Sequence, residues 1–173
     1  DLCELPAKME EILSNAAAVK SIADKLKNFS DMVYIGRGIN LASALEGALK
    51  LKEISYINAN GYAAGELKHG PIALLDENMP VMAVLGPGIT LPKMISNCEE
   101  AKARNALLAA VVSEKADIAP GLFDYRLNIP DTNETTFPLL ANIPLQLLAY
   151  YIADSLGREV DQPRNLAKSV TVE

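Results

Sequence analysis

The chain has 173 residues and a mass of 18.6 kDa, the size of one ordinary domain. Half of the residues are hydrophobic and 22% are charged, which excludes a disordered, collagen-like or low-complexity protein. Acidic residues outnumber basic ones by 22 to 16, and the net charge of -6 argues against a nucleic-acid binder. The apolar run 106–112 is too short to cross a bilayer, so we expect a soluble protein with no membrane contact.

The amino terminus and the cysteines indicate the origin and the compartment of the chain. It starts without an initiator Met, a basic segment or an apolar signal segment, so we expect a piece of a longer polypeptide. Cys3 and Cys98 have no metal-ligand spacing, and two thiols do not make a disulfide framework. We therefore expect reduced thiols, no metal and a cytoplasmic location.

Apolar periodicity predicts alternating helices and strands. Helical spacing predicts helices over residues 8–27, 40–57, 92–104 and 137–156, with Asn40 as a candidate N-cap. Short apolar segments predict strands over residues 32–35, 81–85 and 106–112, and residues 125–129 are a further candidate strand. Residues 58–61 are expected to break the second helix, and residues 62–71 to form a structured loop. The alternation favours a parallel sheet between helical layers, with ligands beyond the carboxyl ends of its strands.

Glu46, Lys50 and Glu53 form a polar stripe on the predicted helix 40–57. Their i, i+4, i+7 spacing places them on one narrow face, while apolar side chains cover most of the remaining circumference. A helix that is apolar on nearly every side is normally buried, so the stripe faces either a sliver of solvent or a polar cavity. In the first case Glu46 and Lys50 form an ordinary surface ion pair, and in the second they belong to a site.

His69, in the predicted loop 62–71, is the only histidine. Its side chain exchanges protons near neutral pH, but a loop histidine is also commonly a solvated or structural residue. It has no Cys or carboxylate partner at ligand spacing, so no zinc site is expected. The loop 36–41 matches a dinucleotide fingerprint only in its first two glycines, because Leu41 replaces the third, and a simple strand-to-helix turn is the plainer interpretation.

The last residues, 161–173, mix turn formers, apolar residues and the lysine Lys168. A frayed terminus is usually polar and unpatterned, so we expect this segment to be ordered. It is either a lid over a site or an extended terminal segment that packs for stability alone.

Three segments together resemble one known family. They are residues 44–56 (ALEGALKLKEISY), residues 65–71 (GELKHGP) and the terminal segment 161–173. In this order, they are similar to the carboxy-terminal half of the isomerase region of glucosamine-6-phosphate synthases, also called glutamine:fructose-6-phosphate aminotransferases (isomerizing). The match runs essentially from end to end and is far more specific than any single motif.

The resemblance implies a fold and a domain arrangement. The family has an amino-terminal glutaminase domain followed by two sugar-isomerase (SIS) domains, each a doubly wound, three-layer α/β sandwich with a five-stranded parallel sheet. This chain resembles the second SIS domain, so we expect a leading helix over residues 1–28, the SIS domain over 29–160 and a tail over 161–173. The family converts fructose 6-phosphate to glucosamine 6-phosphate with ammonia released from glutamine, and we expect no cofactor.

The resemblance also implies roles for individual residues. Glu53 would move a proton between C1 and C2 of the sugar, with Lys50 beside it. His69 would assist opening of the sugar ring, and Lys168 would form an imine with the C2 carbonyl.

The proposed chemistry explains these residue types. One carboxylate that reaches both carbons can shuttle the proton through an enolamine-like intermediate, and a nearby cation stabilises the developing oxyanion. Imine formation needs an amine that loses its proton, which a tail folded over the sugar promotes by excluding water. Substrate contacts are expected at Glu46 and Ala167, and from its spacing Glu46 would orient Lys50.

Two departures from the family pattern affect what the chain can do. Asn58 and Asn60 stand where relatives commonly have a His and an acidic residue. The Ser/Thr-rich loop that binds the sugar phosphate belongs to the first SIS domain, and the catalytic histidine of the family comes from a neighbouring subunit. We therefore expect that a complete site needs further domains and a homodimer, and that this chain alone is inactive.

Two other classes of function remain open. SIS domains also serve as noncatalytic sugar-phosphate sensors in regulators, and a third possibility is a dimerisation scaffold. The joint presence of a base, its neighbouring cation, a histidine and a tail lysine favours the enzyme domain, because a sensor requires neither a base nor an imine lysine.

Overall fold

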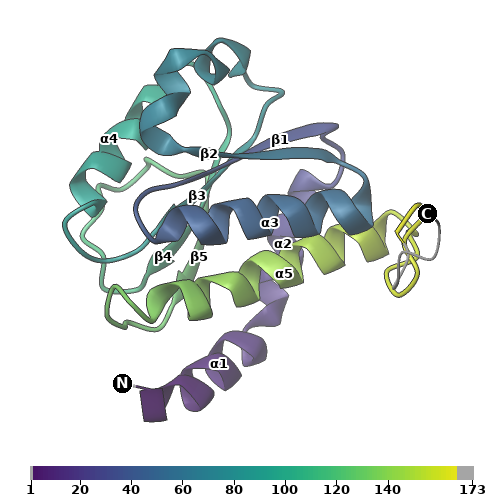
Figure 1. Ribbon diagram of the computed structural model, residues 1–173, viewed down its shortest axis with the longest axis horizontal. Coiled ribbons are helices and arrows are strands. Elements are labelled where there is room, and N and C mark those ends of the chain that lie inside the picture. The colour runs from purple at the N-terminus through teal and green to yellow at the C-terminus, as the bar shows by residue number, and fades with distance from the viewer. Residues whose placement is uncertain (1, 167–173) are drawn as a thin grey trace, which may run out of the picture.

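The computed structural model describes residues 2–166 as a five-stranded parallel sheet between two layers of helices (Figure 1). The strands, in the spatial order β2-β1-β3-β4-β5, are β1 (Asp31–Gly36), β2 (Asn58–Ala63), β3 (Val81–Leu85), β4 (Leu108–Ser113) and β5 (Tyr125–Ile129). The helices are α1 (Leu5–Ser14), α2 (Ala16–Leu26), α3 (Asn40–Ser55), α4 (Leu91–Lys102) and α5 (Phe137–Ser155). Short 3-10 helices are η1 (Leu2–Glu4), η2 (Ala64–His69) and η3 (Pro71–Leu74). The expected doubly wound α/β fold is confirmed.

Helices on both faces explain why the central strands are almost entirely apolar. Every residue of β3 and β4 is buried. One face of the sheet is covered by α2, α3 and α5, with α1 packed against α5, and the other by α4, η2 and η3. Within residues 2–166, no helix combines the length and the hydropathy needed to span a membrane.

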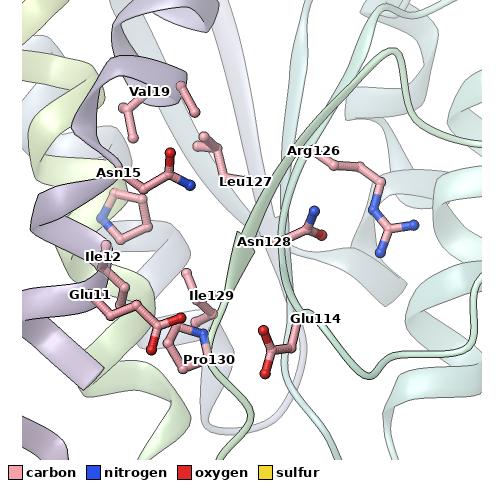
Figure 2. A pocket seen from close by; sticks show the side chains of 12 residues that line it. Glu11, Ile12, Asn15, Val19, Glu114, Arg126, Leu127, Asn128, Ile129 and Pro130 are labelled. Carbon is pink, nitrogen blue, oxygen red and sulfur yellow. The ribbon is translucent and has the colours of Figure 1, made fainter. Parts of the chain in front are cut away.

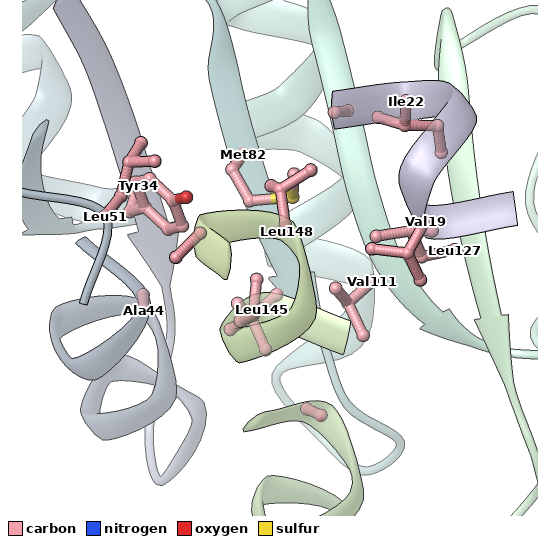
Figure 3. Close-up of a cluster of buried hydrophobic side chains, with 14 of the residues drawn as sticks. Val19, Ile22, Tyr34, Ala44, Leu51, Met82, Val111, Leu127, Leu145 and Leu148 are labelled. Carbon is pink, nitrogen blue, oxygen red and sulfur yellow. The ribbon is translucent and has the colours of Figure 1, made fainter. Parts of the chain in front are cut away.

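The cluster under α5 holds α3 close to the sheet (Figure 3). Leu145 and Leu148 of α5 share this cluster with Met82 of β3 and Tyr34 of β1. A Cβ on Gly47 of α3 would lie 2.9 Å from the Tyr34 ring and 3.0 Å from Leu145, so only glycine lets α3 approach this closely. The close approach fixes the position of α3, the helix that carries the predicted stripe.

The helix α3 runs along the sheet from the carboxyl ends of the strands to their amino ends. These two ends of the sheet are called the carboxyl edge and the amino edge. It follows the end of β1 at Gly36 and ends shortly before β2 begins at Asn58. Asn58 pairs in register with Asp31, the first residue of β1, and Ala63 pairs with Gly36, the last. The last turn of α3 therefore lies beside the amino ends of β1 and β2, whereas η2 begins at the carboxyl edge.

The main difference from the sequence prediction is β2. Residues 58–63 were expected to break a helix and enter a loop, yet they form an edge strand paired with β1 over six positions. The segment NANGYA has no β-branched residue and carries Asn and Gly, which are depleted in strands, so local propensity does not indicate a strand. The strand exists because β1 offers a free edge beside it.

Two helix boundaries also differ from the prediction. The leading helix is interrupted at Asn15, whose backbone is not helical, and Ser14 Oγ donates to the Glu10 carbonyl at 2.8 Å in the turn before the break. Asn40 does not cap α3, because Ile39 occupies the N-cap position and no side-chain cap bond forms. Asn40 is instead buried, with its side chain against Gly86 at the end of β3.

Candidate active site

The stripe predicted on α3 is a connected ion-pair group. Lys50 Nζ donates to Glu53 Oε2 at 2.7 Å and lies 3.8 Å from Glu46 Oε1. The side chains of Lys50, Glu46 and Glu53 are 35%, 38% and 27% exposed, so the stripe is neither buried in the core nor fully in solvent. The geometry is compatible with the prediction that Glu46 orients Lys50, which stays a prediction.

The ion pair keeps a positive charge beside Glu53. The hydrogen bond to Glu53 raises the pKa of Lys50; partial burial opposes this rise, and attraction to Glu53 and Glu46 adds to it. Lys50 is therefore protonated at neutral pH. A carboxylate with a fixed cation at hydrogen-bond distance can remove a proton from carbon while the cation stabilises the negative charge that develops.

Glu53 also lines a pocket between the end of α3 and the carboxyl-terminal segment. The pocket has a volume of about 370 Å³ and is lined by Lys52, Glu53, Tyr56, Arg164, Asn165 and Leu166. Figure 1 shows the last described residues lying beside the carboxyl-terminal end of α3. The predicted base and the segment that leads toward Lys168 thus share one hollow.

Tyr56 joins the terminal segment to α3. The backbone N–H of Arg164 donates to Tyr56 Oη at 2.9 Å, and the Arg164 guanidinium carbon lies 4.1 Å from the centre of the Tyr56 ring. Sequence reasoning missed both residues, because they are 108 positions apart. The one available signal was that Tyr56 follows Glu53 by three positions, a spacing that brings helical side chains together.

In space, His69 lies far from Glu53 of the same chain. It is exposed at the end of η2, which follows the carboxyl end of β2, whereas Glu53 lies in the last turn of α3, which precedes the amino end of β2. The six residues of β2 span five steps of about 3.3 Å, so its two ends are separated by roughly 17 Å. One sugar cannot contact both side chains of the same chain.

The remaining predicted positions have different outcomes. Ala167 and Lys168 lie outside the described residues, so their roles stay predictions. Asn58 Nδ2 donates to Asp31 Oδ1 at 2.7 Å, and Lys52 Nζ donates to Asn60 Oδ1 at 3.2 Å. The two asparagines that depart from the family pattern therefore tie the start of β2 to β1 and to α3.

A second pocket lies beside β5, the edge strand farthest from β2 (Figure 2). It has a volume of about 250 Å³ and lies between the bend that joins α1 to α2 and the edge strand β5. Leu127 and Ile129 point toward the helices, while the polar side chains of Glu11, Asn15 and Glu114 around it are exposed. None of the predicted site residues lines this pocket.

Thiols and possible metal ligands are dispersed in the described part of the chain. Between residues 2 and 166, no three His, Cys, Asp or Glu side chains gather in a way that could hold a metal ion. Burial, with a smaller contribution from Glu99, raises the pKa of the Cys98 thiol to about 12, so this thiol stays protonated at neutral pH.

Comparison with known proteins first defines the class. Residues 25–153 match the family of SIS domains, a range that includes the whole sheet and α3, and the chain belongs to this family. A solved structure, the C-terminal domain of glucosamine-fructose-6-phosphate aminotransferase from Francisella tularensis, is similar with a TM-score of 0.86 and 37% sequence identity, over 93% of this chain and 45% of that chain.

Curated relatives narrow the comparison to particular proteins. The glutamine–fructose-6-phosphate aminotransferase (isomerizing) of Synechocystis sp. is 54% identical over 173 residues, which are 99% of this chain and 27% of that protein. The protein of the same name from Thermosynechococcus vestitus is 53% identical, with 99% and 28% covered. The family resemblance stated from the sequence is confirmed, and the chain spans 27–28% of the length of these relatives.

Proposed function

We propose that the chain is the second isomerase domain of a glucosamine-6-phosphate synthase, which makes glucosamine 6-phosphate from fructose 6-phosphate and glutamine-derived ammonia. The observation that carries this proposal is the Lys50–Glu53 pair at a pocket that the terminal segment also lines. The 54% identity to an isomerizing aminotransferase supports the choice of substrates.

The proposed reaction begins at the C2 carbonyl of open-chain fructose 6-phosphate. The Lys168 amine attacks this carbon and forms an imine with loss of water, and ammonia then displaces the lysine to leave an imine on the sugar. Glu53 takes a proton from C1, so that the C1–H electron pair forms a C1=C2 bond and the C2=N pair moves to nitrogen, which gains a proton. Glu53 returns a proton to C2 as the C1 hydroxyl loses its own, and this produces the aldehyde of glucosamine 6-phosphate. Lys50 stabilises the charge that develops on the C1 oxygen.

A second copy of the chain would supply His69. His69 lies beyond the carboxyl edge of the sheet and Glu53 lies at its amino edge. This separation supports the second part of the proposal, because a sugar phosphate cannot bridge the two side chains. In a symmetric homodimer, each Glu53 would meet the histidine of the other copy in two equivalent sites. The histidine would assist ring opening, since imidazole exchanges protons near neutral pH.

Further domains of a longer protein would complete the enzyme. In the proposal, a glutaminase domain supplies ammonia and a first SIS domain binds the sugar phosphate, so the chain alone is inactive. The length of the relatives, of which this chain spans 27–28%, leaves room for both domains. We also propose a cytoplasmic location, and the free thiols of Cys3 and Cys98 agree with a reducing compartment.

The substitution Glu53→Gln in the full-length protein tests the assignment of the base. It keeps the size of the side chain but removes its basicity, so glucosamine 6-phosphate formation is expected to fall by about 10²- to 10⁴-fold while glutamine hydrolysis continues. The matched control is Glu10→Gln, an exposed position on α1, which is expected to change neither rate. Equal loss of both activities in Glu53→Gln would contradict the proposal.

A further inference from the structure

The backbone of Tyr56 is in an unusual conformation for a tyrosine. Tyr56 follows the last residue of α3 with φ 67° and ψ 13°, in the left-handed region. Glycine is the usual residue at such a helix end, and asparagine is the common substitute. The other non-glycine residues with positive φ between positions 2 and 166 are Asn105 and Asn165, which fit this rule. The tyrosine at this helix end therefore occupies a conformation against its local backbone preference.

The side chain of Tyr56 explains what offsets this strain. Its hydroxyl accepts the backbone N–H of Arg164 at 2.9 Å, and its ring lies 4.1 Å from the Arg164 guanidinium carbon and 5.5 Å from that of Arg158. The hydroxyl contact is made to the main chain, so it fixes the path of the terminal segment and not only the position of one side chain. The ring adds a cation–π contact to the same residue.

The contact determines where the terminal segment meets the predicted base. Asn165 and Leu166, which follow Arg164, line the pocket together with Glu53 and Lys52. Glu53 lies in the last turn of α3 and Tyr56 is the residue that ends this helix, so the predicted base and the tyrosine are held at the same helix end. A segment that is fastened to Tyr56 thus arrives at the Glu53 pocket in a fixed register.

We propose that Tyr56 is a positioning residue that fastens the terminal segment at Arg164 and so sets the register in which this segment approaches the Glu53 pocket. The inference rests on the proposed function, in which the next part of the segment brings Lys168 to the sugar. Tyr56 itself takes no part in bond making; it acts through the main chain of Arg164.

Three substitutions in the full-length protein separate this role from a structural one. Tyr56→Gly removes both contacts with Arg164 and the ring contact with Arg158 but suits the left-handed backbone, so the melting temperature is expected to stay the same or rise. Tyr56→Phe removes the acceptor of the Arg164 N–H and keeps the ring. Arg164→Ala keeps the backbone donor and removes the cation. Tyr125→Phe on β5, the edge strand farthest from β2, is the matched control.

Amide hydrogen exchange measures the fastening itself, without reference to the reaction. Peptides that contain Arg164 are expected to exchange roughly threefold faster in Tyr56→Phe and roughly tenfold faster in Tyr56→Gly, which corresponds to the loss of one and of two weak contacts. Glucosamine 6-phosphate formation is expected to fall by similar factors while glutamine hydrolysis stays constant, so less product forms per glutamine consumed. Reduction with borohydride in the presence of fructose 6-phosphate is expected to trap less lysine-linked sugar by the same factors.

The outcomes distinguish this inference from the proposed function. Unchanged exchange at Arg164 in Tyr56→Gly, or a fall in melting temperature with equal loss of both activities, overturns the positioning role. Faster exchange with unchanged product formation also overturns it. If Lys168→Arg still yields trapped sugar, or Glu53→Gln still isomerises, the proposed function is wrong, whatever the exchange of Arg164 shows.

Discussion

The carboxyl and amino edges of the sheet differ in what their side chains do. In doubly wound sheets, ligands usually bind beyond the carboxyl ends of the strands, where the strand order reverses. In this sheet that point lies between β1 and β3, and it is filled by the buried side chain of Asn40. The amino edge has the ion pair of Lys50 and Glu53 and the pocket beside the terminal segment.

Packing explains the contrast. A side chain on Gly36 would collide with the backbone at Asn40, and one on Gly86 would collide with the Asn40 side chain, so the start of α3 leaves no room between the strand ends. At its other end, the last turn of α3 lies beside the amino ends of β1 and β2, and Lys52 and Glu53 line a pocket with the terminal segment. The comparison teaches that the predicted catalytic residues Lys50 and Glu53 lie at the end of a helix on the amino edge, whereas His69 of the same chain follows the carboxyl edge.

The largest expected effect comes from mixing two inactive full-length variants, which tests whether Glu53 and His69 act from different copies of the chain. Glu53→Gln and His69→Asn are each expected to lose at least about 100-fold of the synthase activity. If each site takes Glu53 from one copy and His69 from the other, subunit exchange restores about a quarter of the wild-type rate, because half of the dimers are hybrids and half of their sites are intact.

The control for subunit exchange is a mixture of Glu53→Gln with Lys50→Ala. Both changes affect the same helix, so in hybrids each site still lacks one member of the ion pair and no activity is expected to return. Recovery in this control, or none in the first mixture despite demonstrated exchange, would show that His69 and Glu53 do not meet across copies.

A substitution with a smaller expected effect tests the packing at the carboxyl edge of the sheet. Gly86→Ala places a methyl group on the Asn40 side chain and is expected to lower the free energy of unfolding by about 1–3 kcal/mol. Chemical denaturation of the chain measures this loss. Substitutions of Lys50 or Glu53, whose side chains are partly exposed, are expected to change activity far more than stability.

The double variant Asn40→Ala/Gly86→Ala identifies the cause. Asn40 Oδ1 is buried and has no hydrogen-bond partner among residues 2–166, so its removal costs little and makes room for the new methyl group. The double variant is expected to recover most of the stability that Gly86→Ala loses. A purely additive loss would mean that the carboxyl edge is not filled as described.

The two edges also differ in how much the sequence could predict. Runs of apolar residues indicated β1, β3 and β4 because these strands are almost entirely buried, and helical spacing correctly brought Glu46, Lys50 and Glu53 together. The strand β2 was missed because its residues do not favour a strand, and its pairing depends on β1. The contact of Tyr56 with Arg164 was missed because no local pattern relates residues that far apart in the chain.

The smallest expected effect concerns the acid stability of the amino edge. Hydrogen bonds from Ser30 Oγ at 2.6 Å and Asn58 Nδ2 at 2.7 Å lower the pKa of Asp31 below its ordinary value of 3.8. A carboxyl group with a lowered pKa in the folded state contributes stability that is present above pH 3.8 and is lost as the pH falls through the folded-state pKa.

Asn58→Ala removes one of these donors and moves the pKa of Asp31 back toward 3.8. Because Asp31 is largely screened by solvent, the variant is expected to be less stable by about a few tenths of a kcal/mol at pH 6, with the difference vanishing near pH 2. Urea denaturation at both pH values measures it, with Asn128→Ala on the other edge strand as control. A loss that is independent of pH would instead assign the role of Asn58 to strand pairing and not to the charge of Asp31.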